Sequence, residues 1–118
     1  MAYSTYAILP MSYQIEFYNS RVQTSIETWP TGISASFVRI TEKMVIYGPD
    51  LGMPYTKAIG SGLFEIRARG QEGIGRAFYC TQKGQRIIIL HGFIKKSQAT
   101  SQADLKSARR KHKEINNA

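Results

Sequence analysis

The sequence predicts a single α+β domain of two layers, in which two N-terminal helices and one C-terminal helix cover one face of a mostly antiparallel sheet. The order of patterned segments is one strand, two helices, three strands and a final helix. A length of 118 residues suits one domain with its own core, and 42% apolar with 20% charged residues is ordinary for a globular chain. Helices on one face would leave the other face of the sheet open for a ligand.

Ten residues precede any pattern, so we expect residues 1–10 to be an N-terminal extension and residues 11–118 to form the domain. Residues 13–18 then alternate apolar and polar side chains, as a half-buried strand does. Asn19 or Ser20 can cap the short helix that follows.

Two helices are expected next. The short one should end at Glu27, just before Trp29-Pro30. The second should run from Thr31 to Tyr47, because its apolar residues recur at spacings of three and four and form one stripe. A glycine and a proline then end it, and residues 49–60, which contain two glycines and two prolines, are expected to be an ordered loop.

The second half reads as three strands and a helix. Strands are expected over residues 63–69, 76–81 and 86–93, joined by a loop over 70–75 and by a Lys83-Gly84 turn. The consecutive apolar residues in the third strand favour an interior position, buried on both faces. The last helix should run from Ser101 to Ile115, capped by Thr100 or Ser101, with Asp104 at capping-box spacing and Leu105, Ala108, His112 and Ile115 turned inwards.

The formal net charge of +8 is unevenly distributed. Residues 1–59 carry four cations and four carboxylates, whereas residues 60–118 carry twelve cations and four carboxylates. Such asymmetry favours a polyanionic partner, either nucleic acid or an acidic protein surface. The alternative is that the charge serves solubility alone.

Several classes of protein are disfavoured by what the sequence contains. One cysteine, Cys80, excludes an intrachain disulfide and an all-cysteine zinc site, and two histidines give no zinc motif. Apolar runs are much shorter than the ~20 residues that span a membrane. No cation precedes Arg21, so a secretory signal is not expected. We therefore expect a cytoplasmic protein that binds no metal, cofactor or membrane.

Three segments carry a family resemblance: Gly62-Leu63-Phe64-Glu65-Ile66-Arg67, Arg76-Ala77-Phe78-Tyr79, and Leu90-His91-Gly92-Phe93-Ile94-Lys95-Lys96. Together they resemble the phage-derived, HigB-like toxins of type II toxin–antitoxin systems, within the RelE/ParE superfamily. The resemblance covers roughly residues 11–116. Ser101 stands where the family often has a proline that opens the last helix.

The resemblance implies a RelE-like domain that acts as a ribosome-dependent, metal-independent mRNA endonuclease and inhibits translation. It also implies a helix-turn-helix antitoxin of the HigA type as partner, besides mRNA and the ribosome. Two alternatives remain open at this point. One is a non-catalytic poison of DNA gyrase, as in the ParE branch, and the other is a non-toxic RNA-binding module.

Cleavage of RNA without a metal needs a base for the 2′-hydroxyl, cations for the phosphorane and an acid for the leaving oxygen. Arg67 and Arg69 lie two apart on one strand and therefore share a face. A hairpin that places Arg69 near Arg76 adds a third guanidinium. We expect Arg67 and Arg76 to stabilise the scissile phosphate and Arg69 to bind RNA peripherally, unless Arg67 only pairs with Glu65.

Further candidates follow along the chain. Lys95 or Lys96 could serve as the base, because neighbouring arginines disfavour a charged lysine, and His91 could act as acid or base. Alternatively, either lysine could only bind the RNA backbone or belong to a solvated strand end, and His91 could be a packed, hydrogen-bonded residue. Phe78 and Tyr79 are further candidates for RNA binding, because their rings could stack on bases. Arg109 and Arg110 are the last candidates for RNA binding, although they could instead contact an antitoxin or only solvent.

Overall fold

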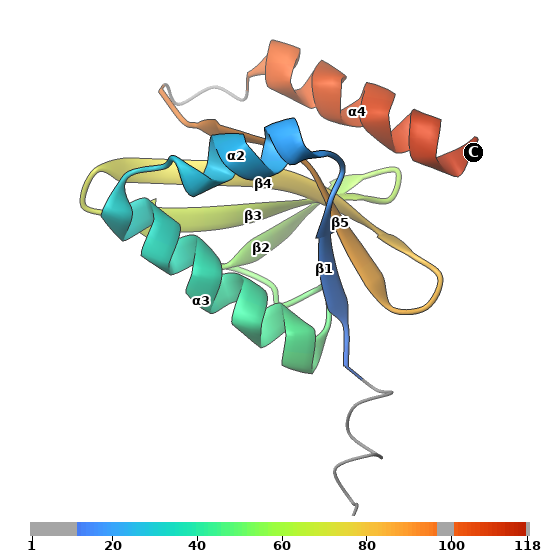
Figure 1. Ribbon diagram of the computed structural model, residues 1–118, viewed down its shortest axis with the longest axis horizontal. Coiled ribbons are helices and arrows are strands. Elements are labelled where there is room, and N and C mark those ends of the chain that lie inside the picture. The colour runs from blue at the N-terminus through green and yellow to red at the C-terminus, as the bar shows by residue number, and fades with distance from the viewer. Residues whose placement is uncertain (1–11, 97–100, 118) are drawn as a thin grey trace, which may run out of the picture.

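A computed structural model describes residues 12–96 and 101–117. The predicted extension over residues 1–10 and the alternative cap Thr100 lie outside these ranges. The elements, in chain order, are β1 (Gln14–Phe17), α2 (Ser20–Glu27), α3 (Thr31–Tyr47), β2 (Thr56–Gly60), β3 (Leu63–Gly70), β4 (Gly73–Gln82), β5 (Arg86–Ile94) and α4 (Gln102–Asn116) (Figure 1).

The strands form one five-stranded sheet in the order β1-β5-β4-β3-β2. Only β1 and β5 are parallel, and the other neighbours are antiparallel. The predicted α+β class and mostly antiparallel sheet are therefore confirmed. The interior position of β5 is also confirmed, since it lies between β1 and β4 and buries all four residues of 87–90.

The helix ends follow local chemistry. The Asn19 side chain accepts a hydrogen bond from the backbone N–H of Val22 (2.9 Å), so Asn19 is the cap of α2. Ser101 accepts from the N–H of Asp104 (3.3 Å), as expected for α4. At the start of α3 no side chain of that helix acts as a cap; the Glu72 carboxylate of the β3–β4 turn accepts from the N–H of Gly32 instead (3.0 Å).

Two loop predictions were wrong. Residues 56–60 form β2, an edge strand that pairs with β3 through a register shift and ends in glycine, which leaves little pattern to detect. The loop over residues 70–75 shrinks to Gln71 and Glu72, because Gly73–Gly75 already belong to β4. Gly75 is required by packing: a Cβ there would lie 2.7 Å from Trp29 and Ile33.

One core fills the space between α2, α3 and the sheet. Val22, Ile26 and Trp29 contribute from the α2 region, and Ile33, Phe37, Ile40 and Met44 form the predicted stripe of α3. They pack against Ile66, Ala68, Ala77, Tyr79, Ile87 and Ile89 of the strands. This face of the sheet is therefore covered as expected.

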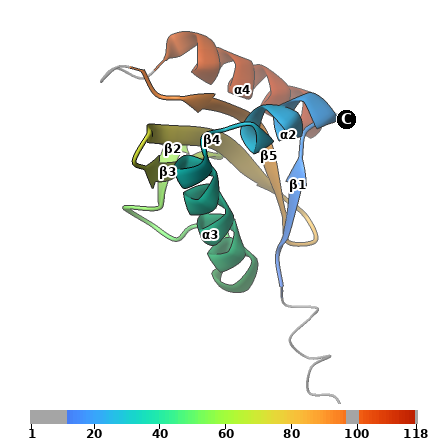
Figure 2. The same cartoon turned by 60° about the vertical axis from the view of Figure 1, so that its left-hand side comes forward.

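The prediction that all helices share one face was wrong, because α4 packs on the opposite face (Figures 1 and 2). Here Leu105, Ala108 and Ile115 of α4 contact Leu63, Phe78, Cys80, Ile88 and Leu90. The cause is the apolar content of β4 and β5, whose alternating side chains are buried on both faces. Only the part of this face beyond α4 remains free for a ligand.

Within the described ranges, none of the helices is long and apolar enough to cross a membrane. In the same ranges, the His, Cys, Asp and Glu side chains form no group that could hold a metal ion.

Candidate nucleic-acid interface

The arginines of β3 and β4 meet on the sheet face that carries α4. Arg67 lies opposite Arg76 and Arg69 opposite Ile74 in the antiparallel register. The expected shared face is therefore confirmed, although the partner of Arg76 is Arg67 and not Arg69. Since like charges directly opposite each other are destabilising, this pairing requires a compensating group.

Glu65 is that group. Its carboxylate lies 3.3 Å from Nη1 of Arg76 and both side chains are buried. Arg76 Nε, also buried, has no hydrogen-bond partner among the residues that the structure describes. The pairing with Glu65 that the sequence suggested for Arg67 is thus made by Arg76. Arg67 is half-buried and Arg69 is exposed, so these two guanidiniums are the ones that solvent or RNA can reach.

Lys95 joins these arginines at the end of β5. Its backbone N–H donates to the carbonyl of Ile74 (2.8 Å), which fixes it beside the start of β4. Loss of solvent contact lowers the pKa of Lys95, and repulsion from Arg76, Arg67 and Arg69 lowers it further, against an opposing effect of Glu65. We call Arg67, Arg69, Arg76 and Lys95, with Glu65, the sheet-end cluster. Lys96, the next residue, is exposed.

The two predicted stacking rings are not available to a base, because Phe78 and Tyr79 are both fully buried. Phe78 packs against Phe93, with ring centroids 5.7 Å apart. Tyr79 points to the other face, where its hydroxyl donates to the carbonyl of Pro49 and where burial raises its pKa. Phe93 is only half-buried and lies opposite Arg76. Phe93 was not among the residues predicted to bind RNA, although it alternates with His91 in β5 and with Lys95 just after that strand.

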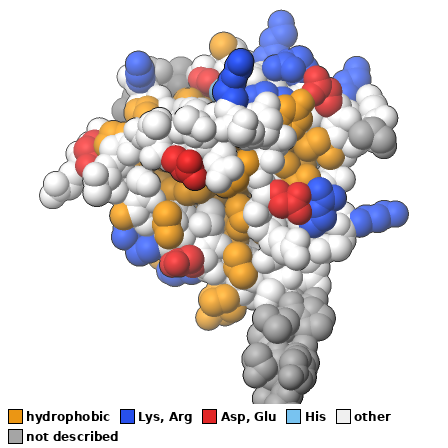
Figure 3. All heavy atoms as spheres, in the orientation of Figure 1, with side chains coloured by type: hydrophobic (Ala, Val, Ile, Leu, Met, Phe, Trp, Pro, Cys, Tyr) orange, Lys and Arg blue, Asp and Glu red, His pale blue; other side chains and the backbone are white. Residues whose placement is uncertain are grey.

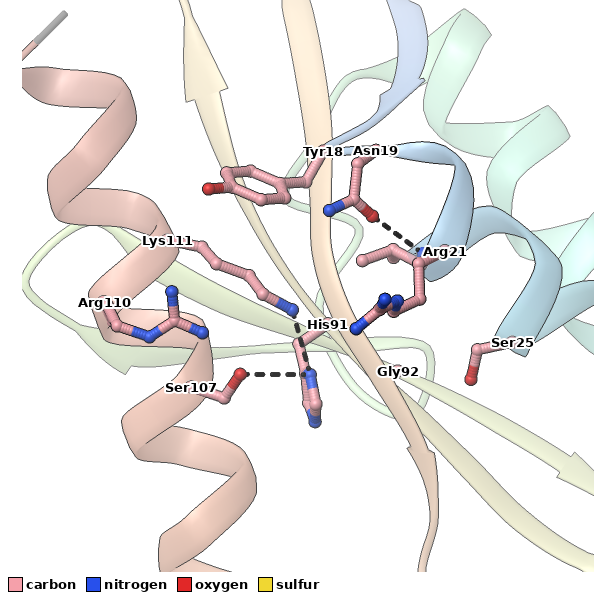
Figure 4. Close-up of a pocket in the computed structure, with 10 residues that line it drawn as sticks. Tyr18, Asn19, Arg21, Ser25, His91, Gly92, Ser107, Arg110 and Lys111 are labelled. Atoms are coloured by element: carbon pink, nitrogen blue, oxygen red, sulfur yellow. Dashed lines mark hydrogen bonds between the residues drawn. The ribbon is translucent and has the colours of Figure 1, made fainter.

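The His91 side chain lies beside α4, next to Ser107 and Lys111 (Figure 4). Its Nε2 is 2.6 Å from Oδ1 of Asp104. Its Nδ1 is 3.4 Å from both Oγ of Ser107 and Nζ of Lys111. Within the described residues, the hydrogen-bonding partners of the His91 ring therefore come from α4, and not from the lysine and arginines with which it was predicted to act.

The arginines of α4 are exposed, and Arg110 pairs with Glu114 one turn later (3.4 Å). Figure 3 shows basic side chains gathered over the upper part of the molecule, where α4 lies. Arg109 and Arg110 line a shallow groove of about 620 Å³ on the outer side of this helix, together with Ala103, Lys106, Ser107 and Lys113.

Comparison with known proteins identifies the family of this chain and a solved structure with a similar fold. Among proteins of curated function, none matches the chain. The fold is similar to a chain of the "Crystal structure of archaeal RelE-RelB complex from Pyrococcus horikoshii OT3", with a TM-score of 0.54 and 20% identity, covering 75% of this chain and 100% of that one. Residues 24–113, more than half of the chain, match the family described as "Phage derived protein Gp49-like". The expected phage-derived family and RelE-like fold are thereby confirmed, and the chain belongs to the Gp49-like family of phage-derived proteins.

Proposed function

We propose that this protein is the toxin of a type II toxin–antitoxin system and cleaves mRNA on the ribosome without a metal ion. The observation that carries the proposal is the sheet-end cluster, in which desolvation and then repulsion from three arginines lower the pKa of Lys95. Family membership and the similarity to a RelE chain support the same conclusion. The cytoplasm is the compartment in which such an activity meets its substrate.

The residues of the cluster, together with the exposed Lys96 that follows Lys95, suit the steps of transesterification. Lys95 takes the proton of the 2′-hydroxyl as its oxygen attacks the adjacent phosphorus, and Arg67 holds the non-bridging oxygens. The bond to the 5′-oxygen breaks, and the Lys96 ammonium supplies the proton that this leaving group needs. The products are a 2′,3′-cyclic phosphate and a 5′-hydroxyl.

Arg76 acts mainly through its position. Because Glu65 holds one end of its guanidinium, Arg76 contributes a fixed positive charge behind Arg67 and Lys95. A charge fixed before the reaction needs no reorganisation as the phosphorane forms. Arg69, exposed at the rim, binds the RNA backbone.

The proposed protein partner is a helix-turn-helix antitoxin of the HigA type. The basic outer side of α4 is the surface that we assign to it, since an acidic or polar partner segment would be attracted there. This assignment leaves the sheet-end cluster for RNA.

The test is cleavage of a defined mRNA on purified ribosomes, with products mapped by primer extension. We expect cuts with wild-type protein in the presence of a chelator and none with Arg67→Ala. Arg39→Ala, on the exposed side of α3, is the matched control. DNA damage and filamentation without mRNA cuts would instead indicate a gyrase poison, and absence of growth arrest would indicate a non-toxic RNA-binding module.

A further inference from the structure

A second basic site lies outside the sheet-end cluster, in a cavity of about 450 Å³ between α2 and α4. β1 pairs with β5 only as far as Ile89, so the two helices flank the next residues of β5 on that side. Arg21 and Ser25 line the cavity from α2, and Ser107, Arg110 and Lys111 line it from α4 (Figure 4). His91 and Gly92 form its floor. Its volume falls in the range of small-ligand pockets, about 300–1,000 Å³.

The cations of this cavity are incompletely neutralised. Desolvation lowers the pKa of Lys111 most, followed by repulsion from Arg110 and Arg21. The carboxylate that opposes this shift is Glu114, which is shared, because it also accepts from the Tyr18 hydroxyl and from Arg110. An anion bound between Arg21 and Lys111 would relieve the repulsion.

His91 leaves the charge of Lys111 uncompensated as well. Asp104 faces Nε2 at 2.6 Å, so in the neutral ring the proton lies on Nε2 and is donated to that carboxylate. Nδ1 is then the acceptor for the ammonium of Lys111 and the hydroxyl of Ser107. A ring nitrogen and not a carboxylate therefore faces the Lys111 ammonium at this contact, so this contact adds no negative charge to the cavity.

The remaining walls suit a sugar or base. Lys111 Nζ lies 5.6 Å from the centre of the Tyr18 ring, which together with Val22 gives an apolar surface beside the cations. The Ser25 and Ser107 hydroxyls also line the space and can donate or accept hydrogen bonds. A phosphate with its attached nucleoside matches this combination of cations, hydroxyls and an aromatic ring.

We propose that the cavity between α2 and α4 binds one nucleotide of the single-stranded RNA substrate through its phosphate group, at a distance from the bond that is cut. The proposal rests on the proposed function. Lys95 lies four residues after His91, one residue beyond the end of β5, and alternation along an extended chain places both side chains on the same face, about 13 Å apart at the rise of a strand. One RNA chain that follows β5 can therefore occupy both sites.

The experiment measures binding of a fluorescent, uncleavable 2′-O-methyl octaribonucleotide by anisotropy at several salt concentrations. Arg21→Ala and Lys111→Gln are the test variants, and Arg39→Ala is the control. Each test variant should weaken binding by about 10-fold, as expected for one charge-assisted contact. Each should also flatten the slope of log K against log[salt] by ~0.7, the value for one phosphate of a single strand. Circular dichroism melting verifies that each variant is folded. Because Arg21 is exposed, Arg21→Ala should fold, and it alone decides the test if Lys111→Gln does not fold.

Unchanged affinity and salt slope in folded Arg21→Ala would overturn the proposal. Titration with 5′-AMP, adenosine and inorganic phosphate, followed by the NMR signals of Ser25 and Ser107, identifies the bound group. Shifts with AMP that exceed those with adenosine support a phosphate site, whereas no shift with AMP or phosphate contradicts it. Because neither measurement requires cleavage, an inactive protein that shows these effects would overturn only the nuclease proposal, and an active nuclease without them would overturn only the cavity proposal.

Discussion

The Glu65 carboxylate and the Arg76 guanidinium form an ion pair across β3 and β4, and their side chains are only 2% and 8% exposed. Removing one member of a buried pair leaves an unpaired charge, which costs about 3–5 kcal/mol. We therefore expect Glu65→Ala to lower the free energy of unfolding by about that amount in urea denaturation.

The matched control for this pair is the double variant Glu65→Leu/Arg76→Met. It removes both charges and should regain most of the lost stability, since apolar replacement of a buried pair is often neutral. Equal destabilisation by the single and double variants would contradict the argument. Arg76→Ala is for the same reason a poor probe of activity, because its effects on folding and on the site cannot be separated.

Arg67 offers the cleaner test of the sheet-end cluster. It is half-buried and makes no ion pair within the described residues. Arg67→Ala should reduce mRNA cleavage by ~10²–10³, the effect of losing one preorganised charge contact. The melting temperature should stay close to that of the wild type. Full cleavage by the folded variant would remove Arg67 from the site, whereas exposed Arg39→Ala should leave the rate unchanged.

Lys95 and Lys96 should differ in the pH profile of cleavage. The pKa of Lys95 is lowered, so its neutral, basic form is populated at a lower pH than that of an ordinary lysine. Cleavage should rise with pH and level off near the pKa of Lys95. Lys95→Ala should abolish this rise. Lys96→Ala should lower the rate at every pH but leave the rise with pH unchanged. The same rise in both variants would show that neither lysine is the base.

Much of the fold was predictable because it depends on local chemistry. The apolar stripe of α3, the caps Asn19 and Ser101 and the apolar run of β5 each follow from spacing or from one side chain. The face on which α4 packs was not predictable in this way. It depends on burial of Phe78 and Cys80 from the opposite side of the sheet, and an alternating pattern does not tell which face a distant helix covers.

In the candidate site, too, the features that depend on local sequence were predictable and those that depend on long-range contacts were not. Alternation along one strand correctly placed Arg67 and Arg69 on one face. The pairing of Arg76 with Glu65 depended on register, and the position of His91 depended on Asp104, which reaches it from α4. Arg21 and Lys111 are ninety residues apart in the sequence, so no motif could have brought them together. Contacts between distant elements thus decided which cations act together.

Glu72 should make the stability of the domain sensitive to acid. Its carboxylate accepts a hydrogen bond from the N–H of Gly32 at the start of α3, which lowers the pKa of Glu72 below the usual value of 4.5. A lowered pKa means that the stabilisation is complete above 4.5 and is lost as the pH falls through the pKa of the folded state. Glu72→Gln should lower the melting temperature at pH 7 and reduce its decline below pH 4.5. Glu42→Gln, on the exposed side of α3, is the control, and the same acid dependence in both variants would contradict this role.

The outer side of α4 should bind the antitoxin and not RNA. Arg109 and Lys113 line its groove but not the cavity behind the helix, so they can be changed without altering Arg110 or Lys111. We expect Arg109→Glu/Lys113→Glu to leave the RNA affinity and its salt slope unchanged, because neither side chain lies in the sheet-end cluster or the cavity. The complex with the proposed antitoxin should weaken, mainly through slower association, since charges at the rim of an interface steer the encounter. Stopped-flow binding at two salt concentrations measures this. A flatter salt slope of RNA binding would instead assign the outer side of α4 to RNA, and no effect on either partner would mean that these charges serve solubility alone.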